Sequence, residues 1–480
     1  MPQLPNIIWL VADHQNHLNP SQNLSYHPLQ LFLRSAGMTF TEARTVLPVC
    51  SPARASMLTG LYPHAHGLTE NDGRFGGRSG LSLSDWMIHH QLMQLGYRCS
   101  WFGKWHVDNK KNAQDYGFEG WSLPGYGYPY STPAYRNYLD RARLNEPVIE
   151  VEIPGESGML PGSRINLCDA KNWFDYEAGS AFLEGDPRTH EAYFVADLAS
   201  KWMGELGERP FFLRVDTWGP HPPYLVGEHQ RQMDSIYDIS LPGSFYSQLE
   251  HRPKHHRDYR DEWQDCLGLN EEGWKRMYLR ALQQAQLVEH ALLGLIRNVD
   301  FEKTLVIFTT DHGDAVGTNG GTANKGGLMT EATLRIPLLF AGPGITPQSQ
   351  SEARVSNMDI VATLMDLIGC HDMRLHSRSL LPLITSKKSD AFESVHLSQH
   401  NGLHVHLPQR AWYDRDWKLV VQADGFLELY HLAADPDELH NLASSEAHRH
   451  IVNYMMSGLS AKMSELGDDF GLSRAFDIFR

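Results

Sequence analysis

The sequence predicts an α/β protein with a small second unit near its C-terminal end, and two observations support the α/β class. Short apolar runs that fit buried strands recur along the chain, and two of them end in an aspartate followed by a histidine. Apolar residues at helical spacing lie between the runs, most clearly over residues 274–299. The strand-like runs are residues 6–12, 210–215, 304–310 and 336–341. Strands that alternate with helices in this way indicate a largely parallel sheet.

A change of composition near residues 384–393 predicts the boundary of the second unit. The elements expected after it are a hairpin at 417–422 and 426–432 and a final helix at 446–465. We therefore expect one large catalytic α/β domain at residues 1–390 and a small α+β subdomain at residues 391–480.

Composition excludes several classes of protein. A chain of 480 residues with 41% hydrophobic content can bury one large core and a smaller one. The formal net charge of −15 argues against a general binder of nucleic acid or of an anionic membrane. Five scattered cysteines without a C-x-x-C pair favour a reducing compartment. The apolar run at residues 7–12 is too short for a signal peptide, so a cytoplasmic location is expected.

A cysteine stands at the predicted start of a helix. Ser51 is expected to cap this helix, Pro52 fits its first turn and Gly60 fits its end. Cys50 then lies at the helix N-terminus, where unpaired N–H groups favour an anion. Arg54 lies one turn further on and shares a face with Cys50. This geometry predicts a nucleophile beside a fixed cation, although a buried structural cysteine is the simpler alternative.

Two aspartates follow predicted strands, and each is followed by a histidine. Asp13 precedes His14, and Asp311 precedes His312. Since the carboxyl ends of parallel strands meet at the ligand-binding edge of a sheet, both acids are candidate metal ligands. Oxygen ligands suit calcium, whereas imidazole suits manganese or zinc. Whether His14 is a ligand or only packs nearby is left open.

Four basic residues stand in settings that suit anion binding and proton transfer. Lys104 and His106 are two apart, so they share a face if the strand expected at residues 97–102 stays extended beyond its end. His221 lies in a loop stiffened by prolines, and Lys325 lies in a glycine-rich loop. A cation next to a titratable ring can bind an anion and move a proton.

Together these motifs resemble the type I sulfatase family, in the order found in that family. The matching residues are Cys50, Pro52, Arg54, Leu58, Thr59 and Gly60; Gly103, Lys104, Trp105 and His106; Pro220, His221 and Pro223; Lys325, Glu331, Arg335 and Pro337; and Glu428, Leu429, Tyr430, Asp435, Pro436, Asn441 and Leu442. The resemblance spans residues 6–443 with gaps at 109–185 and 225–272. It implies an alkaline-phosphatase-like α/β/α sandwich with a small C-terminal antiparallel sheet.

The resemblance also implies a modified nucleophile and a metal ion. In this family a maturase oxidises the cysteine, here Cys50, to formylglycine, whose hydrate attacks the ester. The implied ligands of one divalent ion are Asp13, Asp311, His312 and residue 50, with His14 in doubt because the family has an acid there. Calcium is the first expectation for the ion, with manganese or zinc as alternatives.

The family pattern implies roles for the remaining site residues. Arg54, Lys104 and Lys325 neutralise the sulfate oxygens, and His221 or Lys325 protonates the departing alcohol. His106 removes a proton from the hydrate in the second half of the cycle. Asn71 and Trp218 are expected to contact substrate.

Three classes of function follow from these residues. The first is a hydrolase of a small-molecule or saccharide sulfate ester. The second is a phosphonate monoester or phosphodiester hydrolase of the same superfamily, and the third is a non-catalytic binder of sulfated ligands. No nucleic acid or membrane partner is expected, and a homo-oligomer is left open.

Four further segments complete the expectations. Residues 109–185 match no family motif, are rich in Gly, Pro and Tyr, and are expected to form loops that shape specificity or add packing. Residues 81–95 and 189–207 fit helices. The charged run at 250–257 is expected to be a solvated surface.

Overall fold

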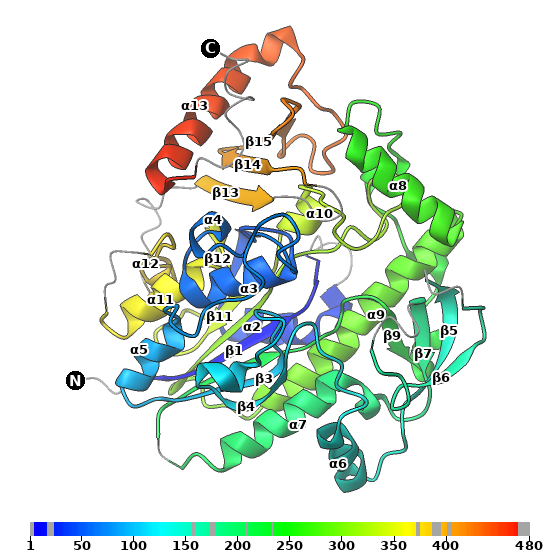
Figure 1. Ribbon diagram of the computed structural model, residues 1–480, viewed down its shortest axis with the longest axis vertical. Helices are drawn as coiled ribbons and strands as arrows, with labels where there is room; N and C mark the ends of the chain where they lie inside the picture. Colours follow the sequence, from blue (N-terminus) through cyan, green and yellow to red (C-terminus); the bar gives the residue numbers. More distant parts are fainter. Residues whose placement is uncertain are drawn as a thin grey trace.

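The computed structural model describes residues 4–16, 24–155, 159–172, 178–207, 209–232, 234–370, 375–385, 395–400 and 406–468. Its centre is an eight-stranded sheet with the order β12-β2-β11-β10-β1-β8-β3-β4 (Figure 1). The strands are β1 (Asn6–Ala12), β2 (Met38–Arg44), β3 (Arg98–Lys104), β4 (Glu119–Leu123), β8 (Phe211–Asp216), β10 (Thr304–Thr310), β11 (Leu338–Ala341) and β12 (Ser349–Ser356). β10, β1, β8 and β3 are neighbours and run parallel. Their carboxyl ends therefore meet at one edge of the sheet.

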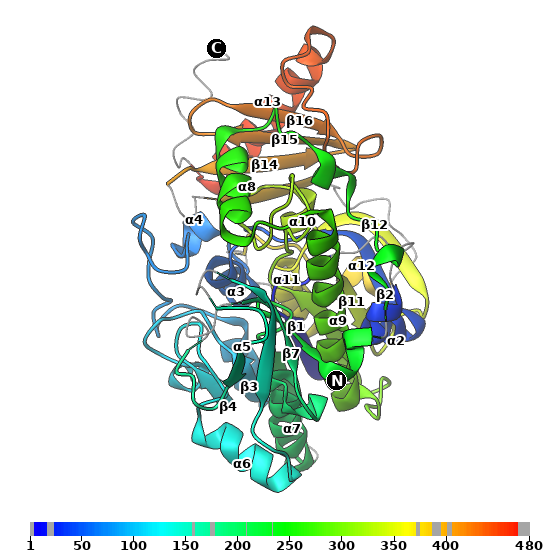
Figure 2. The same ribbon diagram turned by 90° about the vertical axis from the view of Figure 1, so that its right-hand side faces the viewer.

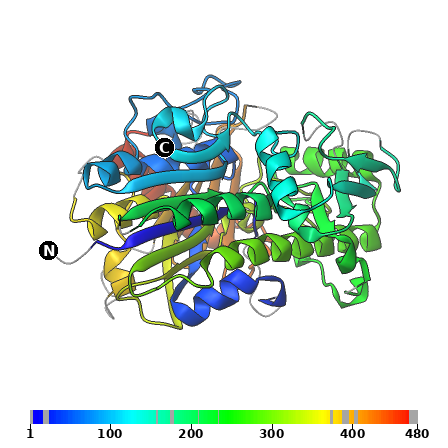
Figure 3. The same cartoon turned by 90° about the horizontal axis from the view of Figure 1, so that it is seen from below.

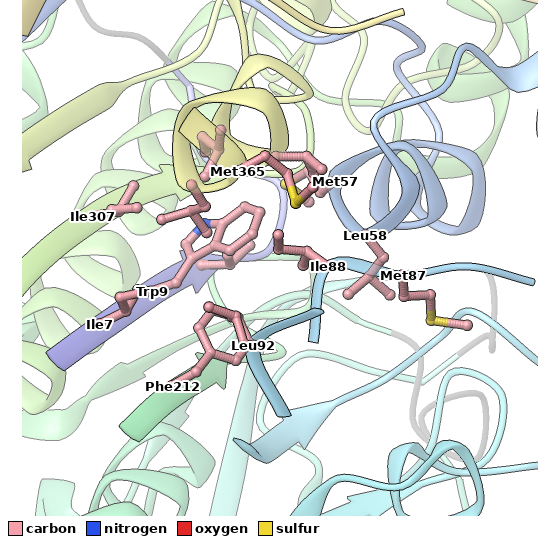
Figure 4. Close-up of a cluster of buried hydrophobic side chains, with 14 of the residues drawn as sticks. Ile7, Trp9, Met57, Leu58, Met87, Ile88, Leu92, Phe212, Ile307 and Met365 are labelled. Carbon is pink, nitrogen blue, oxygen red and sulfur yellow. The ribbon is translucent and has the colours of Figure 1, made fainter. Parts of the chain in front are cut away.

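Helices cover both faces of this sheet, which confirms the predicted α/β/α sandwich (Figure 3). Alternate residues of β1 explain why: Ile7, Trp9 and Val11 face one core, and Ile8 and Leu10 face the other. The first core, drawn in Figure 4, is closed by α3 (Cys50–Thr59), α5 (Ile88–Gln94) and α11 (Asp359–Leu367). The second is closed by α2 (Pro28–Ala36), α7 (Glu191–Gly204) and α9 (Glu271–Ile296).

A separate four-stranded antiparallel sheet forms the predicted C-terminal part, at the top of Figures 1 and 2. It consists of β13 (Val395–His400), β14 (Gln409–Asp414), β15 (Trp417–Gln422) and β16 (Leu427–His431), with α13 (Arg449–Leu466) packed on it. The hairpin and the final helix are therefore confirmed. The predicted boundary between residues 390 and 391 lies outside the described residues, so the two-domain division stays a prediction.

The expectation of loops over residues 109–185 is wrong. The segment supplies the edge strand β4, helix α6 (Pro133–Ala142) and three strands of a third sheet, ordered β6-β5-β7-β9. These strands are β5 (Val148–Pro154), β6 (Arg164–Asn166), β7 (Ala178–Leu183) and β9 (Tyr224–Gly227). Apolar and acidic residues alternate along β5, with Ile149 and Val151 buried. That two-residue period was the signal in the sequence for a half-buried strand.

The charged run at 250–257 is also not a solvated surface throughout. It leads into α8 (Lys254–Leu267), and Arg252 and His256 within it are buried. The Arg252 guanidinium donates to Glu428 Oε2 over 3.0 Å and lies over the Tyr430 ring. Its partners come from the C-terminal sheet, so local sequence could not reveal them.

The remaining helical elements are short. They are α4 (Pro63–His66), α10 (Glu331–Leu334) and α12 (Leu381–Thr385), with 3₁₀ turns at Leu24–Tyr26, Ala113–Tyr116, Pro187–Thr189, Glu228–Gln232, Ile236–Asp238, Gly243–Tyr246 and Glu446–His448. The helix expected at 81–95 is confined to α5, whereas α7 and α9 match their predicted ranges within a few residues. Within the described part of the chain, every helix is too short or too polar to cross a membrane.

Candidate active site

Chemically active residues gather where the four parallel strands end. Asp13 follows β1, Asp311 and His312 follow β10, and Lys104 closes β3. One ligand atom from each of Asp13, Cys50, Asp311 and His312 lies within 4.8 Å of the others, and all four residues are buried. The carboxyl edge of the sheet thus gathers side chains that are far apart in the sequence.

Cys50 is the first residue of α3, not the residue before it. Val49 is the N-cap in extended conformation, and Ser51 lies inside the helix, so the prediction that Ser51 caps the helix is wrong. The Ser51 N–H instead donates to the Asn71 side-chain oxygen over 2.9 Å. Gly60 ends the helix as predicted, with φ 67° and its N–H bonded to the Ser56 carbonyl. Asn71 therefore supplies the cap and lies at the start of the helix that carries Cys50.

The orientation of His312 suits a metal ligand. Its Nδ1 lies 2.9 Å from the Gly313 carbonyl oxygen, which can only accept a hydrogen bond. Nδ1 therefore carries the proton, and the lone pair on Nε2 points toward Cys50 Sγ at 3.1 Å. A backbone carbonyl that fixes the tautomer in this way is usual for metal-binding histidines.

The two strand-end carboxylates also fit a cation. Burial, and then the negative charge of Asp311, raise the pKa of Asp13 to about 8. Burial acts to raise the pKa of Asp311 as well, but His312 and Arg54 outweigh it and hold that pKa well below its usual range. The Lys104 ammonium donates to Asp13. Two buried acids and an imidazole beside residue 50 form a donor set that accommodates one divalent ion.

Arg54 is fully buried, and its N–H groups point to carboxylates. Nε donates to Asp311 over 3.0 Å, Nη1 to Asp216 over 2.7 Å, and Nη2 to Asp13 over 3.4 Å. The guanidinium thus fixes both candidate metal-binding acids. Its predicted contact with sulfate stays a prediction.

Asp216 was not identified from the sequence. It ends β8, and its second oxygen accepts from Arg214 Nε over 2.8 Å. The Arg214 guanidinium lies between the rings of Trp9 and Trp101, at 4.3 and 4.2 Å from their centroids. A third acid at a parallel strand end, matching Asp13 and Asp311, was the available signal.

His14 stands beside the four-residue group, not inside it. Its ring lies 4.7 Å from that of His312 and 4.6 Å from that of His221, centroid to centroid. Its Nδ1 is 3.5 Å from Lys325 Nζ, and its Nε2 is 3.6 Å from a carboxylate oxygen of Asp314. Burial, and then Lys325 and His312, lower its pKa well below the ordinary value. A role for His14 as a ligand stays a prediction.

Lys325 and His221 form a pair on the same side of the site. Lys325 Nζ lies 3.3 Å from His221 Nε2 and 2.9 Å from the Asn324 side-chain oxygen. His221 Nδ1 donates to the Pro222 carbonyl over 2.6 Å, which leaves Nε2 as an acceptor. Burial, and then Lys325, hold the pKa of His221 well below its usual range. The lysine is therefore the proton donor of this pair.

His106 lies near Lys104, but not along an extended strand. β3 ends at Lys104, and His106 has φ 50°, so the expected shared strand face is wrong. Its buried Nδ1 has no hydrogen-bond partner among the described residues. Burial, and then Lys104 and Arg54, lower its pKa well below the ordinary value. A neutral ring with an unused nitrogen can accept a proton.

Trp218 is buried next to the site and bonds the loop that carries Tyr126. It is only 1% exposed, its indole N–H donates to the Tyr126 carbonyl over 2.6 Å, and its backbone N–H donates to Glu191. Burial raises the pKa of Glu191 to about 8. Contact of Trp218 with substrate stays a prediction, since the observed bonds position a loop.

Comparison with known families defines the class of protein. The sulfatase family model matches residues 5–370, and the model for the C-terminal region of N-sulphoglucosamine sulphohydrolase matches residues 324–465. The chain belongs to the sulfatase family and is a sulfuric ester hydrolase.

Two sulfatase relatives are similar to the chain over most of their length, and two solved structures share its fold. The chain is 24% identical to the uncharacterized sulfatase YidJ of Escherichia coli, over 97% of this chain and 88% of that protein. It is 26% identical to arylsulfatase K of Rattus norvegicus, over 92% and 75% of the two chains. Its fold matches BT4656 in complex with D-glucosamine-2-N,6-O-disulfate, with a TM-score of 0.74, 17% identity, and coverage of 98% and 100%. It also matches the phosphonate monoester hydrolase SpPMH from Silicibacter pomeroyi, with a TM-score of 0.75, 18% identity, and coverage of 98% and 97%.

Proposed function

We propose that the chain hydrolyses sulfate esters through a formylglycine that a maturase makes from Cys50, with one divalent ion held by Asp13, Asp311, His312 and residue 50. The observation that carries the proposal is the convergence of these four side chains at a helix N-terminus. Asp13, Asp311, His312 and residue 50 would hold the ion, which would supply a Lewis acid for a sulfate oxygen, and the hydrate of formylglycine at residue 50 would supply a nucleophilic oxygen. Calcium is the first expectation, and His312 keeps manganese and zinc as alternatives.

The cations of the site bind and orient the sulfate. Lys104 and Lys325 are both buried, so their charges act at low dielectric on an anion placed between them. Arg54 keeps the carboxylates of Asp13, Asp216 and Asp311 in place through one hydrogen bond to each. Because these groups are fixed before substrate arrives, little reorganisation is needed as charge develops on the sulfate oxygens.

Two histidines serve opposite proton transfers. Lys325 gives a proton to the departing alcohol, either directly or through His221 Nε2, which lies 3.3 Å away. His106 accepts a proton through its unpaired Nδ1 when sulfate is released.

The substrate class we propose is a sulfated saccharide or a similar small sulfate ester. Support comes from relatives: one similar structure contains a glucosamine disulfate, and a relative from Capra hircus, 22% identical, is an N-acetylglucosamine-6-sulfatase. We also propose a cytoplasmic location, on the odd number of cysteines.

Conversion of Cys50 is tested by mass spectrometry of the peptide that contains it, after co-expression with a formylglycine-generating maturase. Formylglycine in the active preparation supports the proposal. Full activity with an unmodified thiol would sink it. A Cys50→Ala variant made in the same cells is the control, and we expect it to be inactive.

Reaction class is tested by parallel assays on aryl sulfates and aryl phosphonate monoesters. A phosphonate hydrolase is the second candidate, because the same cations would bind a phosphonate oxygen and the fold is shared with such enzymes. Faster turnover of the phosphonate would make it the better assignment. Tight binding of a sulfated ligand without any turnover would favour a non-catalytic binder.

A further inference from the structure

The ring of Tyr126 touches three of the groups that the proposed reaction uses. Lys104 Nζ lies 3.9 Å from the ring centroid, over its face. The imidazoles of His106 and His221 each lie 5.3 Å from it, at interplanar angles of 86° and 63°. Tyr126 belongs to a segment that matches no family motif, and it contacts both the proposed base and the proposed leaving-group side.

The loop around Tyr126 is built to hold that ring. The Gly125 N–H donates to the Asp108 carbonyl over 2.8 Å, and the Tyr126 carbonyl accepts from the Trp218 indole over 2.6 Å. Gly127 has φ 75°, and a Cβ there would lie 2.9 Å from Leu123 and 3.3 Å from Trp218. A side chain at residue 127 would therefore push the loop out of place.

We propose that Tyr126 is a positioning residue for the hydrolysis: its face holds the Lys104 ammonium, and its T-shaped contacts fix the orientations of His106 and His221. This inference rests on the proposed function. Lysine has a flexible stem, and an aromatic face attracts its charge where water is excluded. Imidazoles that pack against an aromatic ring in a T-shaped contact lose freedom to rotate away from the reacting atoms. Without the ring, Lys104 keeps its bond to Asp13 and His221 its bond to the Pro222 carbonyl, but the three groups lose the side chain that contacts them all and aligns them with one another.

The experiment compares Tyr126→Leu, Tyr126→Phe and the control Tyr128→Leu in the metal-loaded, Cys50-converted enzyme. Leucine removes the aromatic face, whereas phenylalanine keeps it. Tyr128 is a buried neighbour in the same loop, and its hydroxyl bonds the Leu167 carbonyl. Steady-state kinetics are measured on aryl sulfates with leaving groups of different basicity, and thermal melting checks folding.

For Tyr126→Leu we expect kcat to fall about 10- to 100-fold, as small misplacements of catalytic groups do, with little change in KM. The loss should grow with the basicity of the leaving group, because protonation is misaligned. Tyr126→Phe should restore most of kcat. A kcat for Tyr126→Leu like that of wild type, equal losses for leucine and phenylalanine, or an equal loss for Tyr128→Leu would each overturn the inference.

Wild-type turnover separates this inference from the proposed function. An inactive wild-type enzyme overturns both. An active wild-type enzyme with an unaffected Tyr126→Leu variant overturns the role of Tyr126 alone.

Discussion

Two clusters of buried charge in this protein differ in how completely they are paired. One is the candidate active site. The other lies between the central sheet and the C-terminal sheet and is called here the junction network. The junction network consists of Arg44, Arg252, Glu331, Lys418, Glu428 and Glu438. Lys418 Nζ lies 2.6 Å from Glu438 and 3.3 Å from Glu331, and Arg44 lies 2.7 Å from Glu331. Every charge there has an opposite partner.

The active site leaves part of its bonding capacity unused. Lys325 makes no ion pair with any described residue. His14 Nε2 and His106 Nδ1 are buried without a hydrogen-bond partner in the part of the chain that the structure describes. Buried polar groups are rarely left so unless a ligand completes them. Unpaired buried nitrogens also occur elsewhere, as in His256, so the comparison rests on the charged groups: those of the junction network are paired with one another, whereas Lys325 has no acidic partner among the described residues.

The largest effect should come from the acids of the site. Asp311→Asn should remove bound metal and lower kcat at least about 10³-fold, since it disables a central group of the machinery. The measurements are metal content by mass spectrometry and turnover of an aryl sulfate. Asp359→Asn changes a buried carboxylate that caps backbone N–H groups elsewhere, and it should keep the metal. If Asp311→Asn kept its metal and its activity, Asp311 would not be a metal ligand.

The pair of Lys325 and His221 should show a smaller, substrate-dependent effect. Loss of a general acid costs about 10²- to 10⁴-fold, and most for leaving groups that need the proton. His221→Ala and Lys325→Met should therefore slow alkyl sulfates far more than nitrophenyl sulfate. Kinetics on both esters with each variant provide the measurement. Equal losses on the two esters would assign these residues to sulfate binding instead.

How much the sequence could predict depends on whether a contact is local. The strand at residues 304–310 and its terminal Asp311 could be predicted because a buried β-branched run and its end are visible in one window. The hydrogen bond from the Ser51 N–H to the Asn71 side chain could not be predicted, because Asn71 lies 20 residues away and replaces the local serine as the cap. The position of Asp216 at a strand end was visible in the sequence, but its hydrogen bond with Arg54, on another element, was not.

The same reasoning explains the error at residues 250–257. Arginine is usually a surface residue, and the burial of Arg252 depends on distant partners, among them Glu428, 176 residues later, and the Glu438 carbonyl. Local patterns therefore predict which residues end a strand, whereas tertiary pairing decides which charges are buried.

Substitutions in the junction network should lower the unfolding free energy and leave kcat unchanged. Lys418 is fully buried between two glutamates. Lys418→Met leaves these carboxylates without a shared cation, which should cost about 3–5 kcal/mol of unfolding free energy. The kcat of the folded enzyme should stay near wild type. Lys254→Met, which removes an exposed pair with Asp258, is the control and should not change stability measurably. Urea unfolding measures the stability of both variants, and steady-state kinetics give kcat. A Lys418→Met variant that keeps wild-type stability but has a lower kcat would contradict the structural role of the junction network.

The smallest effect should be on the pH dependence of the unfolding free energy, where Glu331 and Glu438 of the junction network are expected to act in opposite directions. Burial acts to raise the pKa of Glu331, but Arg44 and Lys418 outweigh it and hold that pKa below its usual value of about 4.3. The unfolded chain therefore binds more protons than the folded one below about pH 5, so this group adds stability at neutral pH that is lost as pH falls. Glu438 has the opposite sign, because burial raises its pKa and its contribution weakens as pH rises. Glu331→Gln should flatten the dependence of unfolding free energy on pH in the acid range, and Glu438→Gln should steepen it. Urea unfolding of both variants at several acidic pH values measures the two slopes, and changes of the same sign would show that the two carboxylates titrate as one unit and not as separate partners of Lys418.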